Sequence, residues 1–175
     1  MADQDANTPN PEENGEAQAQ APQAATIAQY IKDFSAESPS SPQVFQWPTQ
    51  PTLDVQFGIN GTKVSDDVHE VVLKIDLTAK SDSGTHFILD LSYAGLFAFR
   101  NFPDEALPPF LLVEAPRLLF PFARQIVAES VQNLGFPPVL LDPIDFASAY
   151  VSQMEAQQQV ANQPGGDGEP PVGHA

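Results

Sequence analysis

The sequence predicts an α+β domain in which a four-stranded antiparallel sheet is followed by a long helix and a second, C-terminal helix. Apolar and polar residues alternate between residues 53 and 99, which is the period of half-buried strands. After Arg100 the apolar residues recur at the spacing of a helix. All the aromatic residues lie between residues 26 and 151, so the folded domain is expected there.

The two ends of the chain differ in composition from this middle. Residues 1–25 and 152–175 contain acidic residues but no Lys or Arg, and few large apolar side chains. Such segments bury too little apolar area to offset the loss of chain entropy on folding. We therefore expect an acidic, disordered tail at 1–25, a domain at 26–151, and the end of the last helix with a second acidic tail at 152–175.

Three strands are predicted to form a meander of hairpins. They alternate over Leu53–Ile59, Val71–Ala79 and Phe87–Phe99, with turns at GTKVSDD and KSDSGT. Asn60-Gly61-Thr62 matches a glycosylation sequon but is interpreted as a hairpin turn. The stretch Ile27–Ala36 alternates less cleanly and is predicted as a fourth strand at the sheet edge.

The helical half of the domain contains prolines that limit where helices can begin. Apolar residues at helical spacing end before Gly135, Pro137 and Pro138. Because proline disrupts a helix interior, this helix either begins near Pro116 or runs from about Pro109 with a bend. A second helix is predicted from Asp142, as N-cap, through Met154.

Composition excludes several classes of function. The 175 residues include 23 acidic and 7 basic side chains, a net charge of −16, and this argues against nucleic acid as a partner. Cysteine is absent, which excludes disulfides and thiolate sites. No apolar run is expected to span a membrane, and the first residues, MADQDANTPN, do not resemble a secretory signal. We expect a cytoplasmic protein that does not insert into membranes.

No candidate catalytic or metal site stands out. His69 and His86 have no second histidine at ligand spacing and are predicted to lie at strand ends or on the surface. Asp66-Asp67 is predicted to be a solvated turn rather than a catalytic pair. Phosphate-binding and nucleophile motifs are absent from the sequence. We expect a protein that is not an enzyme and needs no metal or cofactor.

Three features suggest binding surfaces instead. In the segment LLVEAPRLLFPFARQIVAESV, apolar residues occupy more than one side of the predicted helix. A second apolar side needs cover, which favours an oligomer over a tightly packed monomer. The proline-rich loop Pro39–Pro51 carries Phe45 and Trp47, which either bind apolar partners or pin the loop to the sheet. Asp33, Glu37 and Asp90 form either an acidic patch for a basic partner or an ordinary solvated face.

Three segments of this middle resemble the SecB family of bacterial protein-export chaperones. They are YIKDFSAESPSSPQVF from Tyr30, DDVHEVVLKIDLTA from Asp66, and EAPRLLFPFARQIVAESVQNLGFPPVLLDPIDFASAY from Glu114. The last segment is the most specific, and the similarity covers roughly residues 26–151. The acidic N-terminal extension is similar to that of alphaproteobacterial members.

The resemblance implies a holdase that binds unfolded preproteins and delivers them to the SecA ATPase. It also implies a homotetramer, a dimer of dimers packed through the long helices. A SecB-like chaperone dedicated to a stress or toxin–antitoxin partner is the alternative, which the SecA-docking residues disfavour. The residues implied are Asp33, Glu37, Ile88 and Asp90 for SecA binding, Tyr30, Phe45, Trp47 and Phe146 for client binding, and Leu119, Phe122, Ile126, Val127 and Val131 for the oligomer interface. Ile88 and Asp90 stand where the family more often has leucine and glutamate.

Overall fold

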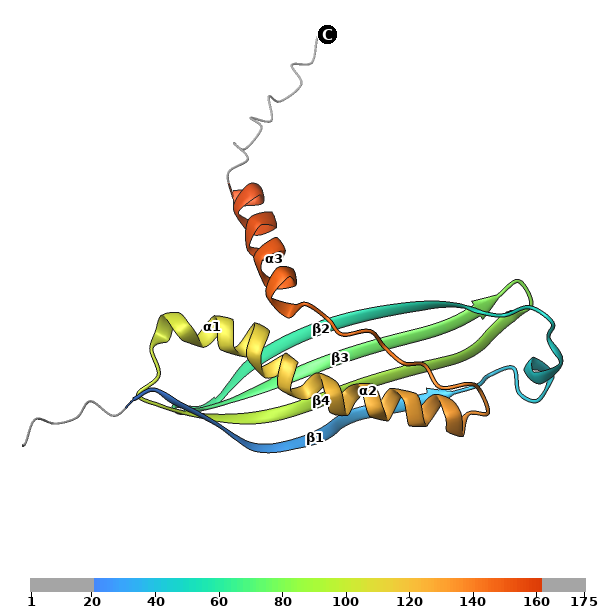
Figure 1. Ribbon diagram of the computed structural model, residues 1–175, viewed down its shortest axis with the longest axis horizontal. Helices are drawn as coiled ribbons and strands as arrows, with labels where there is room; N and C mark the ends of the chain where they lie inside the picture. The colour runs from blue at the N-terminus through green and yellow to red at the C-terminus, as the bar shows by residue number, and fades with distance from the viewer. Residues whose placement is uncertain (1–20, 162–175) are drawn as a thin grey trace, which may run out of the picture.

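The computed structural model describes residues 21–161, which form one sheet, one long helical run and one projecting helix (Figure 1). The strands are β1 (Gln23–Glu37), β2 (Thr52–Ser65), β3 (Val68–Ser81) and β4 (Gly84–Arg100). Their order in the sheet is β1-β4-β3-β2, with each neighbouring pair antiparallel. The predicted fold class is confirmed, with the meander β2-β3-β4 intact and β1 at an edge.

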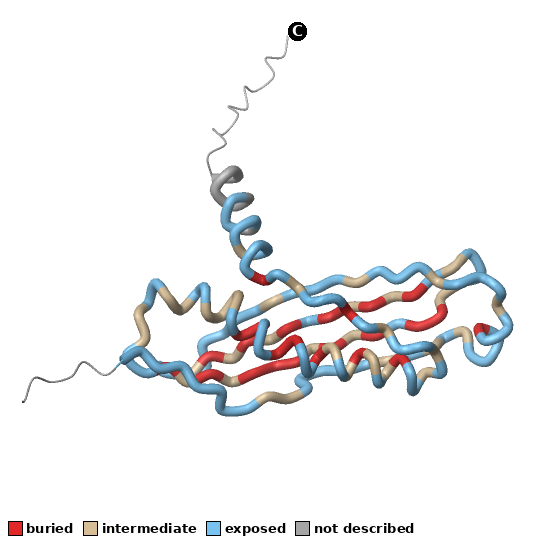
Figure 2. Tube along the Cα trace, viewed as in Figure 1, coloured by how far each residue is buried: buried red, intermediate tan, exposed pale blue. Residues whose placement is uncertain are grey.

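The core lies between one face of the sheet and the helix α2 (Ala115–Asn133). Alternate residues of β3 and β4 point toward α2 and are buried, as the period of two requires. Figure 2 shows that burial concentrates along β3, β4 and α2, whereas the edge strands are largely exposed. The fully buried side chains of the two central strands include Val71, Leu73, Ile75, Leu77, Leu91 and Phe97.

Two strands are longer than the sequence pattern suggests. β2 continues through Asn60-Gly61-Thr62 to Ser65, so the prediction of a turn there is wrong, and the turn falls at Asp66-Asp67. β1 begins at Gln23, inside the segment predicted as the N-terminal tail. The extra residues of β2 and β1 have no apolar alternation of their own. Backbone pairing with β3 orders those of β2, and pairing with β4 orders those of β1. The rest of both predicted tails lies outside the described residues.

The helical run begins just before Pro109, close to the earlier of the two predicted starts. It passes through η2 (Asp104–Ala106), α1 (Leu107–Pro109) and the π-helical η3 (Phe110–Glu114) into α2. The wider π turn comes directly before Pro116, whose ring would clash with the carbonyl four residues earlier in a regular helix. The alternative of a helix that runs through the prolines is therefore the one observed.

This run is long and apolar enough to cross a membrane, judged by length and composition alone, which the sequence pattern did not suggest. In the structure, however, one stripe of α2 packs against the sheet as a core helix does. The opposite side leaves Leu118 46% and Phe122 50% exposed. The helix is therefore a core helix with a second, uncovered apolar side.

The last helix, α3 (Phe146–Ala161), projects away from the sheet (Figure 1). Asp145, not Asp142, caps it: the Asp145 Oδ1 accepts a hydrogen bond from the Ser148 backbone N–H at 3.0 Å. The Ser148 hydroxyl also donates to Asp145 Oδ2 at 2.7 Å. These bonds hold the pKa of the Asp145 carboxyl below its usual value, because they favour the ionised form.

Candidate functional site

The four residues predicted to bind SecA lie on the face of the sheet that points away from α2. In the β1–β4 ladder Glu37 lies opposite Ile88, and Ser35 lies opposite Asp90. Asp33 lies opposite Ser92, two residues further along the same face of β4. Residues paired across a ladder share a face, so the structure brings Asp33, Glu37, Ile88 and Asp90 together on this outer face.

Two further residues of β3 belong to the same surface. Asp76 lies directly opposite Asp90 in the β3–β4 ladder, which places two carboxylates side by side. Lys74 bridges them, with its Nζ 3.1 Å from Asp76 and 3.3 Å from Asp90. The hydrogen bonds to Asp76 and then to Asp90 raise the pKa of Lys74 above its usual value. Alternation along β3 placed Lys74 and Asp76 on the polar side, but the sequence alone did not show that they meet Asp90.

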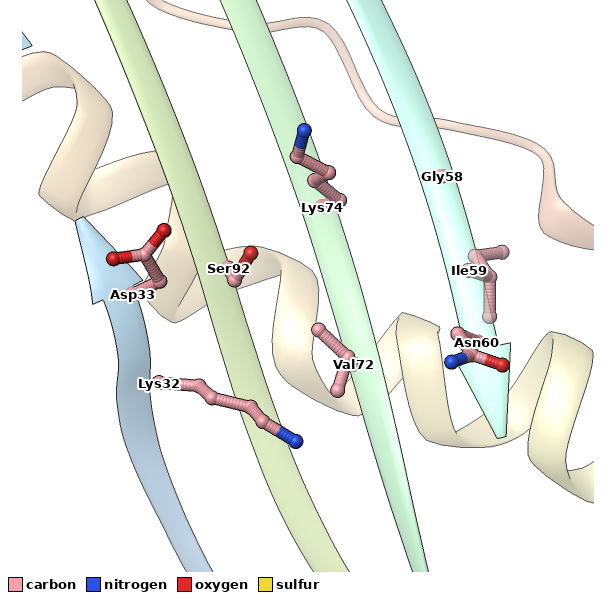
Figure 3. Close-up of a pocket in the computed structure, with 8 residues that line it drawn as sticks. All are labelled: Lys32, Asp33, Gly58, Ile59, Asn60, Val72, Lys74 and Ser92. Atoms are coloured by element: carbon pink, nitrogen blue, oxygen red, sulfur yellow. The ribbon is translucent and has the colours of Figure 1, made fainter. Parts of the chain in front are cut away.

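A cavity of about 400 Å³ hollows this outer face next to the bridging lysine. Figure 3 shows its lining side chains, with Lys32 and Asp33 coming from β1, Ser92 from β4 and Lys74 from β3. The face therefore offers carboxylates, one exposed apolar side chain at Ile88 and a shallow hollow. Such a surface suits a compact basic partner better than an extended apolar chain.

Tyr30 lies on this outer face and not near the other predicted client residues. Its hydroxyl donates a hydrogen bond to the Glu70 carboxylate, which also accepts one from Lys32. These two bonds, the one from Lys32 first, lower the pKa of Glu70, and the bond to Glu70 raises the pKa of Tyr30. The structure therefore places Tyr30 apart from Phe45, Trp47 and Phe146, and its role in client binding stays a prediction.

The proline-rich loop between β1 and β2 packs its two aromatic residues differently. The Trp47 ring meets the His86 ring edge-on at 4.9 Å, and a side chain at Gly84 would approach the Trp47 ring at 3.0 Å. Gly84 also has φ +139°, so both the close Trp47 ring and the backbone conformation favour glycine at this position. Phe45 contacts the Phe136 ring at 5.4 Å but remains 54% exposed. Trp47 thus pins the loop, whereas Phe45 also offers accessible apolar surface.

Two apolar cavities flank the segment that connects α2 to α3. The first, of about 460 Å³, lies near Phe45 and is lined by Leu53, Phe87 and the stretch 136–140. The second, of about 340 Å³, lies between β2 and the start of α3, where Phe57, Ile144 and Phe146 line it. Phe146 is only 5% exposed and packs edge-on against Phe120 at 6.0 Å. Phe45 and Phe146 therefore mark separate cavities along the β2 side of the molecule.

The predicted oligomer residues divide into two groups. Leu119, Val127 and Val131 are fully buried within their own chain, so they belong to its core and offer no accessible surface. Phe122 and Ile126 retain accessible surface, and Phe122 stacks on Tyr93 at 6.4 Å. An interface through α2 has to use the outward residues, to which Leu118 belongs.

Both histidines lie near the start of their strands, as one of the two predicted placements has it, and both are buried. His86 lies under Trp47 and bonds the Ser81 hydroxyl at 2.9 Å, and His69 packs edge-on against Phe99. Burial, with the nearby Lys63 charge, lowers the pKa of His69. Within residues 21–161 no group of His, Asp and Glu side chains is placed to hold a metal ion.

Comparisons with known proteins agree with the fold and extend over nearly the whole chain. Residues 17–157 match the family described as preprotein translocase subunit SecB. A protein of Sphingopyxis alaskensis named protein-export protein SecB is 50% identical over 178 residues, covering 100% of both chains. One of the same name from Zymomonas mobilis is 51% identical over 81% of this chain and 86% of its own.

A solved structure shares the architecture at much lower identity. It is a SecB-like chaperone of Mycobacterium tuberculosis in complex with a peptide from an antitoxin. The TM-score is 0.58 at 18% identity, covering 69% of this chain and 90% of that one. At this identity the likeness extends to the fold alone.

Proposed function

The chain belongs to the SecB family of protein-export chaperones, and from that premise we propose that it acts in the cytoplasm as a holdase that delivers unfolded preproteins to SecA. The single observation that carries this proposal is the meeting of Asp33, Glu37, Ile88 and Asp90 on one open face of the sheet. Because that face points away from α2 and from the apolar cavities, a partner can dock there while a client occupies the other side.

Client binding is assigned to the apolar cavities on the β2 side. Phe136 lines the first cavity and is in contact with the exposed Phe45, and Phe146 lines the second cavity. An unfolded segment that covers these surfaces gains about 25 cal/mol for each Å² of apolar area removed from water. Few polar groups line the cavities, so binding depends on exposed apolar chain rather than on a particular sequence.

Assembly into a homotetramer is proposed through the uncovered surfaces of β1 and α2. β1 is an edge strand with Ile31 48% and Phe34 40% exposed, and α2 exposes Leu118 and Phe122 beside it. Open edges and apolar helix sides of this kind require cover in a soluble protein. Several client cavities on one tetramer would then hold a long chain by avidity.

The alternative, a chaperone dedicated to a toxin–antitoxin partner, explains less of the surface. Such a protein needs the apolar cavities but has no need of the acidic outer face. No catalytic role is proposed, because the family is one of protein-export chaperones.

The docking assignment is tested by replacing Asp33 and Glu37 together with alanine. We expect binding to purified SecA to weaken roughly tenfold or more, because two carboxylates opposite a basic partner are lost. Binding of a chemically unfolded, slow-folding protein should not change. Asp104→Ala with Glu105→Ala is the matched control, since it removes the same charge from exposed positions in η2. Equal weakening in both variants, or unchanged SecA binding in the first, would contradict the assignment.

A further inference from the structure

A basic cavity lies on the flank of α2 that faces the start of α3. It measures about 420 Å³ and is lined from α2 by Arg117, Pro121 and Arg124, and from the segment before α3 by Pro143. The apolar contributors are Phe120, Ile144 and Phe146. Because the whole chain has only seven Lys and Arg residues, two arginines beside one apolar cavity call for an acidic and partly apolar occupant.

The positive charges of Arg117 and Arg124 are only weakly neutralised by acidic side chains of the described residues. Arg117 meets Glu114 at 3.5 Å, but both side chains are at least half exposed, and exposed ion pairs of this kind are weak. Arg124 is half-buried and makes no hydrogen bond or ion pair with any other residue in the described part of the chain. The guanidinium of Arg124 is therefore available to a carboxylate that enters the cavity.

We propose that the occupant is the chain's own C-terminal segment, residues 162–175. This segment contains two carboxylates, Asp167 and Glu169, and no Lys or Arg. Pro170, Pro171 and Val172 follow directly after Glu169. The acidic residues match the two arginines, and the proline and valine side chains match the apolar lining of Phe120, Ile144 and Phe146.

The chain length allows this return. Phe146 lines the cavity and also begins α3, which has 16 residues and so a length of about 24 Å. At roughly 3.3–3.6 Å per extended residue, Glu169 can lie about 26–29 Å from Ala161. Glu169 can therefore come back along α3 to the level of Phe146, and the connection gives the segment a high effective concentration there.

The N-terminal segment is also acidic but joins the fold in a less suitable place. It leads into β1, and β1 and β2 are opposite edges of the sheet. Ile144 and Phe146 line both the arginine cavity and the cavity against β2, so the arginine cavity lies on the β2 side. The C-terminal segment is the occupant that we infer, and an acidic stretch of another protein is the competing outcome.

A paramagnetic label on the full-length chain tests the proposal. The sequence has no cysteine, so Gly168→Cys accepts a single nitroxide. Isoleucine methyl spectra then report proximity, because Ile144 lies in the cavity, whereas Ile88 is on the outer sheet face. Ile27 is a second control, since it is exposed on β1, at the opposite edge of the sheet from the cavity.

We expect the label to broaden the Ile144 methyl signal strongly and those of Ile88 and Ile27 little. Arg117→Gln with Arg124→Gln, and separately Asp167→Asn with Glu169→Gln, should reduce the broadening at Ile144 to that of the controls. Unchanged isoleucine chemical shifts elsewhere will show that the variants remain folded. Equal signals at the three methyls, or broadening that survives loss of both arginines, would overturn the proposal. So would broadening of Ile144 by a nitroxide at Ala6→Cys in place of Gly168→Cys, because the N-terminal segment would then be the occupant.

Discussion

One face of the sheet is covered by α2 and the other is open, and different interactions hold the side chains of the two faces in place. On the covered face Leu73, Leu91 and Phe97 are almost completely removed from water. On the open face the contacts are ion pairs and hydrogen bonds, such as those that join Lys74 to Asp76 and Asp90. Stability should therefore depend mainly on the covered face, and partner recognition on the open one.

The largest expected effect comes from a cavity in the covered face. Phe97→Ala removes a fully buried ring that meets Phe110 at 5.7 Å, and we expect it to lower the free energy of unfolding by about 3–5 kcal/mol. Urea denaturation followed by circular dichroism measures the change. Leu96→Ala is the control, because Leu96 is half-buried and belongs to the open face of the same strand. If both variants lost the same stability, the distinction between the faces would be wrong.

A smaller, pH-dependent effect is expected from Glu70 on the open face. Its pKa lies below the ordinary value of 4.5 in the folded protein, because Lys32 and Tyr30 donate hydrogen bonds to the carboxylate. Its contribution is therefore present above pH 4.5 and is lost as the pH falls through the lower folded value.

Glu70→Gln should lower the denaturation midpoint at neutral pH and make the fall in stability on acidification shallower. Denaturation curves recorded from neutral to acidic pH measure both effects. Glu105→Gln changes the same group at an exposed position and serves as the comparison. A midpoint that falls equally steeply with pH in Glu70→Gln and in the parent protein would contradict this role.

The smallest effect is expected at Lys74. Lys74→Met leaves the carboxylates of Asp76 and Asp90 opposed across the ladder without a bridging cation. We expect a slightly lower denaturation midpoint that added salt restores, because the repulsion is screened. Lys80→Met removes the same charge from an exposed position on the same strand. A loss that is insensitive to salt, or equal in both variants, would show that the bridge does not offset repulsion.

The same two faces show what the sequence could predict and what it could not. Alternation identified the covered face of β3 and β4 because burial imposes a period of two. It could not assign the faces of β1, because the β1–β4 register shifts between Ile31 and Asp33. That irregularity puts Tyr30 and Asp33 on the same face although they are three positions apart.

Long-range contacts decide which side chains are buried where the local pattern does not. Leu119 and Phe122 both follow helical spacing, and only the position of the sheet decides that one is core and the other is accessible. His86 is buried because Trp47, from a distant loop, lies against it. The acidic residues were assigned to docking by family resemblance, and the β1–β4 ladder was needed to show that they share a face.

The central claim is that this chain is an oligomeric holdase, and molar mass by light scattering on a sizing column tests it most directly. The full-length protein is measured alone, with a chemically unfolded slow-folding protein in excess, and with the same protein in its native form. We predict a particle near four times 18.9 kDa that gains mass only with the unfolded form. A monomer that ignores the unfolded chain would contradict the account.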